Sequence, residues 1–384
     1  MTTEPIPRAP SAAEPAEGLT RRRLGIHALA GTAAVVAAPA LAQRAPVSPA
    51  AQAPTVADKV AWPATPATLA AQHRRAFGAL PSRIEQQLPD VQSVAVLHRG
   101  HLAFEHYRSG VTAHTLQDTQ SVTKSVLALL FGQAMADGAV RGVQELVATR
   151  LPAMLRQGAD ERVQRLRFEH LLTMTAGWAG EQTARRDRDD DLRQIVRRPF
   201  VADPGTRFAY DNGAANLLAL ALANVLRQPL SSYARQRLLA PLGIHRMAWR
   251  QGAQGHDLGA LGLSLTTRGM ARLGELVLAE GQWQGQALLP RDYVRAATER
   301  QNAGGYPLGN AYGYLWWVAS TAPTRRAGRR TAMANGYGGQ WIYVYPPLDM
   351  VVAATSRRTP DSMARGQAAT LIRRDILPAL QGLR

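Results

Sequence analysis

Cysteine is absent from the 384-residue chain, and lysine nearly so: Lys59 and Lys124 are the only lysines, and all other members of its 45 Lys and Arg residues are arginine. A chain without cysteine forms no disulfide, no thiolate metal site and no cysteine nucleophile. The nine histidines are dispersed without metal-ligand spacing. Asp187, Asp189, Asp190 and Asp191 are mixed with arginine and are interpreted as part of a solvated loop. We therefore predict no metal and no organic cofactor.

The charge of the chain is strongly basic, at +17, and 46% of its residues are hydrophobic. Such a charge can indicate nucleic-acid binding. However, the arginines are scattered, and no zinc-finger, RNP-like or basic-region pattern occurs. We predict no nucleic-acid partner and interpret the charge as the basic surface of an exported protein. The hydrophobic content supports a sizeable core, in one large or two small domains.

The first 42 residues have the pattern of a twin-arginine export signal. Thr20-Arg21-Arg22-Arg23 precedes an apolar stretch over residues 28–38, and Ala40-Leu41-Ala42 resembles a cleavage site. The apolar stretch is too short and too rich in Ala and Gly to be a convincing membrane span. The pattern predicts a periplasmic or secreted protein with no stable membrane span after cleavage. Residues 43–67, rich in Ala, Pro and Gln, are predicted to form a flexible linker.

Residues 68–384 carry the periodic patterns of a folded domain. The N-terminal part shows helical spacing over residues 69–88, interrupted at Pro81, and then a β-hairpin over residues 91–107. A mainly helical subdomain is expected at about residues 140–289. Its helices are expected over residues 168–175, 213–226, 230–239 and 266–280. Strands are expected over residues 312–318, 341–345 and 350–355, with a closing helix over residues 362–377.

The order of these elements indicates a fold class. The connections between the C-terminal strands are too short for crossover helices, so the strands should pair antiparallel. We predict an α+β fold with one antiparallel sheet built from both ends of the chain. Terminal helices flank this sheet, and the helical subdomain is inserted between the two halves of the sheet.

The first candidate site is Ser121-Val122-Thr123-Lys124, followed by an apolar run. If a helix begins at Ser121, the Ser121 and Lys124 side chains share one face of its first turn. The helix N-terminus favours a serine alkoxide, and a neutral lysine can take the serine proton. Arginine could not, because it stays protonated, which makes one of only two lysines notable here. The alternative is that Ser121 caps the helix and Lys124 is a solvated helix residue.

Two further stretches carry candidate residues. Tyr210-Asp211-Asn212 precedes an apolar helix; a phenol can shuttle a proton, and an amide can bond both a lysine and a substrate carbonyl. The alternative is that Tyr210 packs and Asn212 caps the helix. Asn335-Gly336-Tyr337-Gly338-Gly339 precedes a strand. Its glycines allow close backbone approach, and its free N–H groups could form part of an oxyanion hole. An ordinary hairpin loop is the alternative there.

Taken together and in this order, the three stretches resemble the serine β-lactamase and penicillin-binding-protein fold. The resemblance is closest to class C β-lactamase-related serine hydrolases, among which are 6-aminohexanoate-dimer hydrolase-like amidases, family VIII-type esterases and D-alanyl-D-alanine carboxypeptidase-like proteins. It covers about residues 75–380. The other stretches that carry the resemblance are Leu171–Trp178, Pro204–Tyr210, Leu239–Ile244 and Leu263–Gly274.

The resemblance implies a β-lactamase/transpeptidase-like fold and a role for each candidate. Ser121 is implied as the acylated nucleophile, Lys124 as its general base and Tyr210 as the proton relay to the leaving group. Asn212 would hold the lysine and substrate. The substrate-binding set is completed by the third stretch, namely Asn335, Gly336, Tyr337, Gly338 and Gly339. Backbone groups of Ser121 and of residues 336–339 would stabilise the oxyanion.

The third stretch departs from the β-lactamase pattern. Residues 331–340 contain neither Lys-Thr-Gly nor His-x-Gly, so a cation that would pair with a β-lactam or peptide carboxylate is missing. The sequence therefore favours an exported serine hydrolase that cleaves a small-molecule ester or amide through an acyl-serine. The alternatives are a D-Ala-D-Ala carboxypeptidase or class C-like β-lactamase, and a non-catalytic penicillin-binding-type module.

Overall fold

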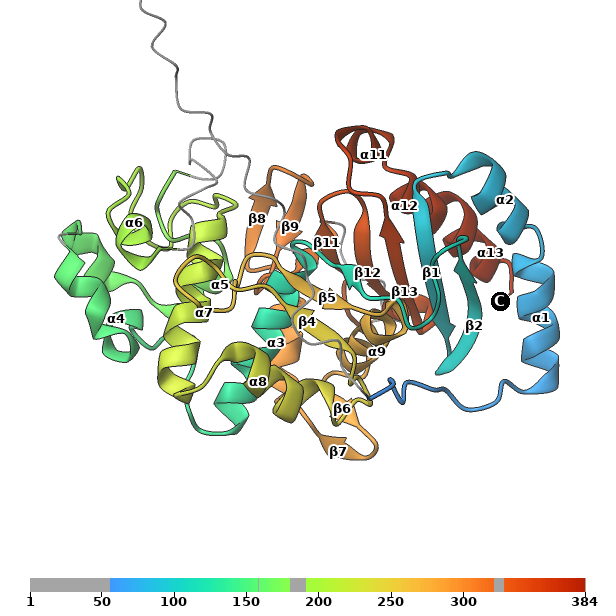
Figure 1. Ribbon diagram of the computed structural model, residues 1–384, viewed down its shortest axis with the longest axis horizontal. Helices are drawn as coiled ribbons and strands as arrows, with labels where there is room; N and C mark the ends of the chain where they lie inside the picture. The colour runs from blue at the N-terminus through green and yellow to red at the C-terminus, as the bar shows by residue number, and fades with distance from the viewer. Residues whose placement is uncertain (1–55, 158, 180–190, 321–327, 384) are drawn as a thin grey trace, which may run out of the picture. The chain divides into compact units, whose positions relative to one another are not determined.

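The computed structural model describes residues 56–157, 159–179, 191–320 and 328–383, and Figure 1 labels its elements. The predicted signal over residues 1–42 lies outside these described residues. So do residues 43–55 of the predicted linker and Asp187, Asp189 and Asp190 of the expected solvated loop. The described elements from residue 56 onward form a large sheet, helices on its faces, and a group of helices beside its β8 edge.

Eight strands form the large sheet in the order β2-β1-β13-β12-β11-β10-β9-β8, and every neighbouring pair is antiparallel. Their bounds are β1 Val91–His98, β2 His101–Tyr107, β8 Asn302–Gly305, β9 Asn310–Tyr312, β10 Trp317–Val318, β11 Ala332–Gly336, β12 Gln340–Tyr345 and β13 Met350–Ser356. Because β1 pairs with β13, strands from the two ends of the chain join in one sheet (Figure 1). This confirms the predicted α+β class and antiparallel sheet.

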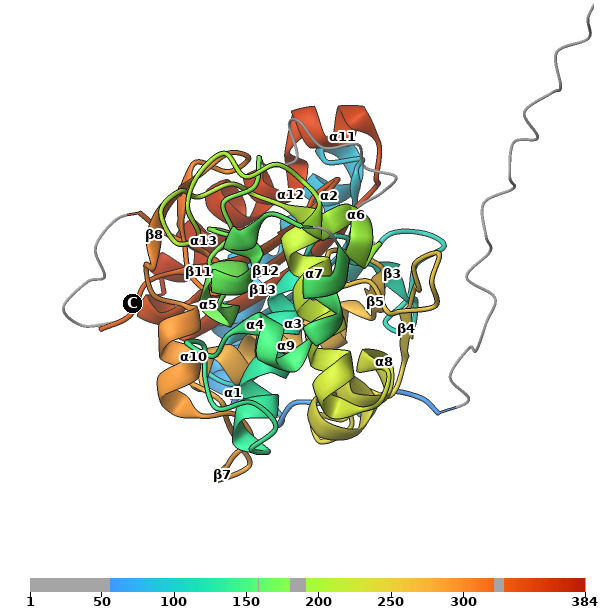
Figure 2. The same cartoon turned by 90° about the vertical axis from the view of Figure 1, so that its left-hand side faces the viewer.

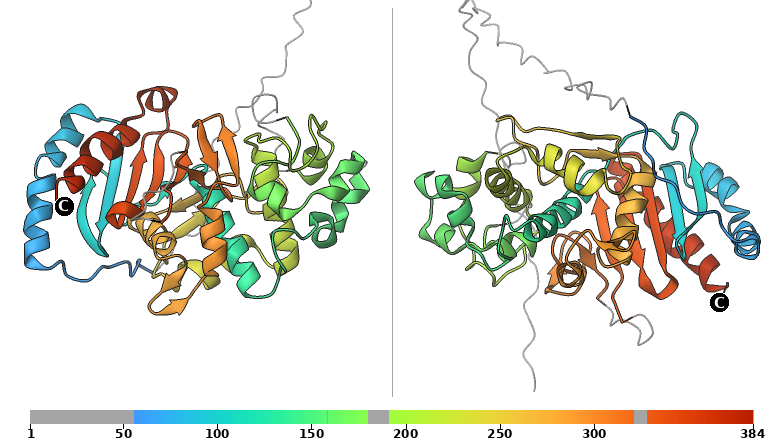
Figure 3. Two further views of the ribbon diagram at one scale, coloured as in Figure 1. Left: turned by 180° about the vertical axis from the view of Figure 1, so that it is seen from behind. Right: turned by 90° about the horizontal axis from the view of Figure 1, so that it is seen from below.

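Helices cover both faces of this sheet (Figure 3). The helices are α1 Ala67–Phe77, α2 Leu80–Gln87, α3 Val122–Ala136, α4 Val147–Arg150, α5 Phe168–Leu172, α6 Leu192–Val196, α7 Asn212–Leu226, α8 Leu230–Ala234, α9 Thr267–Leu278, α10 Arg291–Ala297, α11 Pro360–Arg365, α12 Gln367–Thr370 and α13 Leu377–Gln381. α9 packs against β1, β12 and β13, and α12 packs against β12 and β13. β13 is buried along its whole length, which explains its continuous apolar sequence.

α7 is the centre of the helical group and contacts α3, α4, α5, α6 and α8 (Figure 2). It is apolar on nearly all sides, as a helix surrounded by other helices must be. Short 3₁₀ segments at Pro152–Gln157 and Glu161–Arg165 complete this group, and another at Pro346–Leu348 joins β12 to β13. A π-helical turn at Arg235–Leu239 extends α8 over the length expected for that helix.

The stretch expected to be helical up to residue 289 also contains short strands. β4 Met247–Trp249 and β5 Leu263–Leu265 form a small sheet with β3 Gln117–Asp118, which precedes that stretch, and β6 Gln282–Trp283 pairs with β7 Gln286–Ala287. Strands of two or three residues are too short to show an alternating pattern. α9, expected over residues 266–280, covers Thr267–Leu278 with Thr266 as its N-cap, and it packs on the large sheet.

The single strand expected over residues 312–318 is a correction: the structure has β9 and β10 there, joined by a turn. Gly313 N donates to Trp316 O at 2.8 Å, and Leu315 adopts a left-handed φ of 54°. The turn was not predicted because all its residues are buried and mostly aromatic or apolar. β8, which is rich in Asn and Gly, was not predicted at all.

The single helix expected over residues 362–377 is a second correction. α11 ends at Arg365, and Gly366 takes a left-handed φ of 54° before α12 begins. A π-helical turn at Leu371–Ile376 then connects α12 to α13. The break is a glycine C-cap within an otherwise continuous amphipathic pattern.

Residues 56–66 are anchored along the folded part. The Asp58 carboxylate accepts hydrogen bonds from His245 N, Arg246 N and Thr266 Oγ1 at 2.6–2.7 Å. Trp62 Nε1 donates to the Glu275 carboxylate at 2.9 Å. The described end of the expected linker is therefore held by specific contacts.

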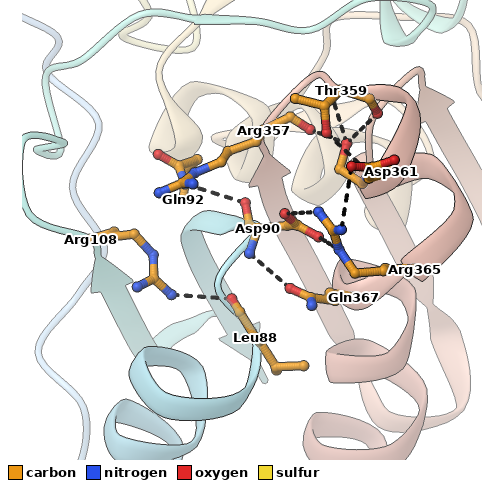
Figure 4. Close-up of polar contacts among 10 residues, drawn as sticks. Leu88, Asp90, Gln92, Arg108, Arg357, Thr359, Asp361, Arg365 and Gln367 are labelled. Atoms are coloured by element: carbon orange, nitrogen blue, oxygen red, sulfur yellow. Dashed lines mark hydrogen bonds and ion pairs between the residues drawn. The ribbon is translucent and has the colours of Figure 1, made fainter.

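Asp90 ties the start of β1 to the helices that follow β13 (Figure 4). Asp90 is 3% exposed, and its carboxylate accepts two hydrogen bonds from Arg365, at 2.6 and 2.7 Å. Asp90 N donates to Gln367 Oε1, and Arg357 N donates to Asp90 O. Every polar group of Asp90 thus has a partner, which locks both ends of the folded part together.

Candidate active site

The N-terminus of α3 brings the first two candidate residues together. Ser121 is the N-cap of α3, and Lys124 lies one turn later. Lys124 Nζ lies 3.0 Å from Ser121 Oγ. Lys124 is 1% exposed, whereas Ser121 is half-buried. The alternative of a solvated lysine is therefore wrong, and the serine remains accessible beside a buried amine.

The segment before Ser121 is held by the small sheet. Thr119 donates from N and Oγ1 to Leu263 O of β5, at 3.0 and 2.7 Å. Gln120 then takes a left-handed φ of 52° and donates its N–H to the Asp118 carboxylate at 3.0 Å. This fixed, unusual conformation sets the direction in which the chain enters α3.

Two carbonyl-type oxygens complete the surroundings of Lys124. Its Nζ donates to Asn212 Oδ1 at 2.6 Å and to Ala260 O at 2.8 Å. Neither oxygen can donate a hydrogen bond in return. A neutral amine would therefore give both of its N–H groups to these oxygens and direct its lone pair at Ser121 Oγ. This arrangement has the geometry of a base beside a nucleophile.

Asn212 is free to bind Lys124 because its neighbour caps the helix. Asp211 is the N-cap of α7 and accepts from Gly213 N at 2.9 Å. Arg198 holds the Asp211 carboxylate with two further hydrogen bonds, both of 2.8 Å. The alternative that Asn212 caps the helix is therefore wrong: Asn212 is the first residue of α7 and turns its amide oxygen towards Lys124.

Ala260 was missed by the sequence analysis because only its backbone takes part. Asn216 Oδ1 of α7 accepts from Gly259 N and Ala260 N, both at 2.9 Å, and so orients this loop. A Cβ on Gly259 would collide with the Ala215 carbonyl, which means that only glycine permits this close approach. Nothing in the sequence pattern distinguishes this loop from others.

The ring of Tyr210 lies beside the side chain of Lys124. Lys124 Nζ lies over the Tyr210 ring, 4.8 Å from its centroid. The phenol hydroxyl forms no hydrogen bond with any residue in the described part of the chain. Tyr210 is half-buried. The ring of Tyr210 is thus held beside Lys124, and its hydroxyl has no hydrogen-bond partner among the described residues.

The third stretch lies against the segment that precedes Ser121. Asn335 and Gly336 end β11, and Tyr337, Gly338 and Gly339 form the turn into β12. A Cβ on Gly336 would collide with Thr119 O and lie 3.0 Å from Gln120 Cβ. The strand end is therefore packed against the entry to α3, and the glycine is required for that approach.

Backbone N–H groups are available at both sides of this contact. Within the described residues, neither Ser121 N nor Tyr337 N donates a hydrogen bond. Unpartnered backbone N–H groups next to a nucleophile are what an oxyanion hole requires. The exposed Tyr337 side chain borders the same place.

One cation near this turn was not expected from the sequence. Arg358 follows β13, and its Nη1 lies 2.5 Å from the Asp118 carboxylate. The Cα of Arg358 lies 2.9 Å from where a Cβ on Gly338 would lie. The third stretch thus lacks a cation of its own but has an arginine next to it, contributed by a different strand end.

The described residues contain no helix that is long and apolar enough to cross a bilayer. Nor do they contain a group of three or more His, Cys, Asp or Glu side chains that could hold a metal ion.

Comparisons with solved structures give several similar folds. A Bacillus anthracis protein assigned as a 6-aminohexanoate-dimer hydrolase has a TM-score of 0.64 at 16% identity, covering 87% of this chain and 86% of its own. EstCE1, described as a hydrolase with promiscuous acyltransferase activity, has a TM-score of 0.64 at 16% identity, with 82% and 100% covered. A penicillin-binding-protein homologue from Caulobacter crescentus has a TM-score of 0.60 at 16% identity, with 79% and 97% covered.

At these identities the structural likeness shows a shared fold, and it confirms the predicted β-lactamase/transpeptidase-like architecture. No curated protein matches the sequence. The sequence itself matches the family described as Beta-lactamase over residues 25–375, which is most of its length. The chain therefore belongs to the beta-lactamase family.

Proposed function

We propose that this chain is a serine hydrolase that cleaves an ester or amide bond through a covalent acyl-serine. One observation carries the proposal: the buried Lys124 amine is held by Asn212 Oδ1 and Ala260 O, with Ser121 Oγ at 3.0 Å. In a neutral amine, these contacts would orient the lone pair towards a half-buried hydroxyl. Family membership and the shared fold support the same chemistry.

In the proposed acylation, Ser121 Oγ attacks the carbonyl carbon while Lys124 Nζ takes its proton. The carbonyl oxygen becomes an oxyanion, which Ser121 N–H and Tyr337 N–H stabilise. The carbon–heteroatom bond then breaks, and the leaving group takes a proton from the Tyr210 hydroxyl, which Lys124 restores. The products are an acyl-Ser121 ester and a free alcohol or amine.

Deacylation repeats these steps with water. Water adds to the acyl carbon as Lys124 or Tyr210 takes one of its protons, and Ser121 Oγ leaves and regains a proton. The products are a carboxylic acid and free enzyme. Asn212 keeps the Lys124 amine in place in both halves of the reaction.

Active-site labelling tests the proposal. We expect a fluorophosphonate to add one phosphonyl group to the full chain, and digestion to place the adduct on the Ser121 peptide. Ser121→Ala should abolish both labelling and hydrolysis of p-nitrophenyl esters, whereas Ser82→Ala, which removes an exposed serine from α2, should change neither. A folded chain that never gains mass would instead support the non-catalytic penicillin-binding-type module.

Arg358 favours a second candidate function. A guanidinium beside the third stretch could pair with the carboxylate of a β-lactam or of a peptide C-terminus. The second candidate is therefore a D-Ala-D-Ala carboxypeptidase or class C-like β-lactamase. Nitrocefin turnover or release of D-alanine from a D-Ala-D-Ala peptide, lost in Arg358→Ala, would favour it over the esterase or amidase. Turnover of neutral esters alone, unchanged in Arg358→Ala, would favour the first candidate.

We also propose export through the twin-arginine route, based on residues 1–42. The test is to express the full chain in a bacterium and to follow its size and compartment. The expected result is a shortened protein outside the cytoplasm, and retention when Arg21 and Arg22 are both replaced by lysine. Processing that is insensitive to this replacement would contradict the proposal.

A further inference from the structure

The hydroxyl of Tyr210 has no hydrogen-bond partner among the described residues. The contacts that hold this side chain are therefore contacts of its ring. Lys124 contacts one part of this ring from 4.8 Å. A phenol whose hydroxyl is unpartnered could rotate or shift unless its ring is packed. The groups that pack the ring therefore decide where the hydroxyl points.

Two aromatic side chains, Tyr312 and Trp317, contact this ring, and Phe208 packs on both of them; we call these three residues the aromatic clamp. The indole of Trp317 is stacked on the Tyr210 ring, with centroids 5.6 Å apart and planes at 20°. Tyr312 meets the Tyr210 ring edge-on, at 6.4 Å and 89°. Stacked and edge-on contacts at these distances are the favourable arrangements of aromatic pairs.

The clamp is itself fixed by the large sheet. Tyr312 of β9 and Trp317 of β10 are direct cross-strand partners, and their rings meet at 4.7 Å and 80°. Both are buried, with 1% and 3% exposure. Trp317 also pairs with Met333 of β11. The indole is therefore attached to the strand layer that also ends in the third stretch.

Phe208 completes the contact from the loop side. It lies two residues before Tyr210, in the same loop. The Phe208 ring is 5.1 Å from the Tyr312 ring and 6.1 Å from that of Trp317. Two rings of the loop thus pack on two rings of the sheet, and this holds the loop before α7 in register with the sheet.

We propose that Trp317 is a positioning residue for proton transfer: it holds the Tyr210 ring so that the phenol hydroxyl faces the leaving group. This inference rests on the proposed acyl-serine function. It predicts a selective defect. A leaving group that departs as a stable anion, such as p-nitrophenolate, needs little protonation, whereas an alkoxide leaving group needs a proton as its bond breaks.

The test compares two esters of one acid, p-nitrophenyl butyrate and ethyl butyrate, in the full chain. Trp317→Leu removes the stacked ring. We expect it to lower kcat/KM for the ethyl ester at least about tenfold more than for the p-nitrophenyl ester, since general acid catalysis contributes about 10²–10⁴-fold. Trp317→Phe keeps a stacked ring and should restore the ratio of the two values to within about threefold of wild type.

A double-mutant cycle shows whether Trp317 acts through Tyr210. Tyr210→Phe should produce the same selective loss, and adding Trp317→Leu to it should cost little more, because residues that act through one another are non-additive. Trp283→Leu is the matched control. It removes a half-exposed indole that packs on Arg272, away from these rings, and should leave the ratio unchanged.

The outcomes separate this inference from the proposed function. If wild type is not acylated on Ser121, the proposed function fails. If wild type is acylated but Trp317→Leu slows both esters equally, or if the effects of Trp317→Leu and Tyr210→Phe multiply, the positioning role is wrong. Should Trp317→Leu fail to fold, Trp317→Met takes its place, because it fills more of the space and also lacks a ring: a larger loss for the ethyl ester than for the p-nitrophenyl ester is expected, and an equal loss for both esters would overturn the positioning role.

Discussion

The cluster around Lys124 and the cluster around Asp90 both join segments that are distant in the sequence through a buried polar side chain. Asp90 is 3% exposed and has partners for its carboxylate, its N–H and its carbonyl (Figure 4). Lys124 is 1% exposed, but one of its three partners is the half-buried Ser121 hydroxyl. The first cluster is closed within the protein, whereas the second opens onto a reactive group.

This difference indicates how sequence changes should act in the two places. A closed polar cluster contributes to stability, because removing one partner leaves the others buried and unpaired. An open cluster keeps a group available for chemistry and contributes less to stability than its burial suggests. Substitutions at Lys124 should therefore change turnover, and substitutions at Asp90 should change the free energy of unfolding.

Replacing Lys124 should have the largest effect on turnover. Lys124→Met removes the base and keeps the apolar stem, so we expect kcat/KM for an ester to fall by at least about 10³-fold. The unfolding free energy should change by less than about 2 kcal/mol, because removing a buried amine offsets the loss of its hydrogen bonds. Steady-state kinetics and urea denaturation measure the two quantities. If Lys124→Met keeps its activity, the claim that the Lys124 cluster serves turnover and the Asp90 cluster serves stability is wrong.

The second-largest effect on turnover is expected at the contact between the third stretch and the entry to α3. Gly336→Ala would push β11 away from Thr119 O and widen the proposed oxyanion site. We expect kcat to fall about 10- to 100-fold, a partial loss of one oxyanion donor. The control is Gly382→Ala, where the nearest heavy atom to an added Cβ lies 3.7 Å away. Equal activity in the two variants would contradict this placement of the third stretch.

Asp90 should show the opposite behaviour. Asp90→Asn breaks the paired hydrogen bonds with Arg365, and we expect the unfolding free energy to fall by about 1–3 kcal/mol with unchanged kcat/KM. The matched control is Asp203→Asn, which breaks an exposed ion pair with Arg165 and should cost well under about 1 kcal/mol. If both variants lose the same stability, the closed cluster is no more stabilising than a surface ion pair.

The pH dependence of the unfolding free energy provides a second test, with a smaller effect, of the stabilisation by the Asp90–Arg365 pair. Hydrogen bonding to Arg365 lowers the pKa of the Asp90 carboxyl, with further contributions from the charges of Arg365, Arg357 and Arg108. A lowered folded-state pKa gives stability that is present above the unfolded value, about 3.9, and is lost as the pH falls through the folded value. The difference in unfolding free energy between wild type and Asp90→Asn should therefore shrink below about pH 4. A constant difference would contradict this cause.

Much of the fold could be predicted because its signals are local. The two runs on either side of Arg99-Gly100 predicted the hairpin that became β1 and β2, and the spacing of Ser121 and Lys124 correctly placed them at the first turn of α3. The turn between β9 and β10 was missed because its conformation depends on Leu315 at a positive φ, in a run that is apolar throughout. A buried turn of this kind leaves no polar residue to mark it.

The site could be predicted only in part, for a related reason. A residue whose side chain has a characteristic chemistry can be recognised in the sequence, as Tyr210 and Asn212 were. Ala260 contributes a backbone oxygen, and Trp317 contributes a ring face from about a hundred positions further along the chain, so neither has a local signal. Arg358 shows the same limit, since it is near the third stretch only in three dimensions.

The most direct test of the account is the mass of the intact chain during turnover of a slowly hydrolysed ester. We expect wild type to gain the mass of one acyl group, carried by the peptide that contains Ser121. Ser121→Ala should gain none, and Lys124→Met should gain it at least about 10³-fold more slowly. An acyl group on any other residue, or acylation of Lys124→Met at the wild-type rate, would contradict the claim that Lys124 activates Ser121.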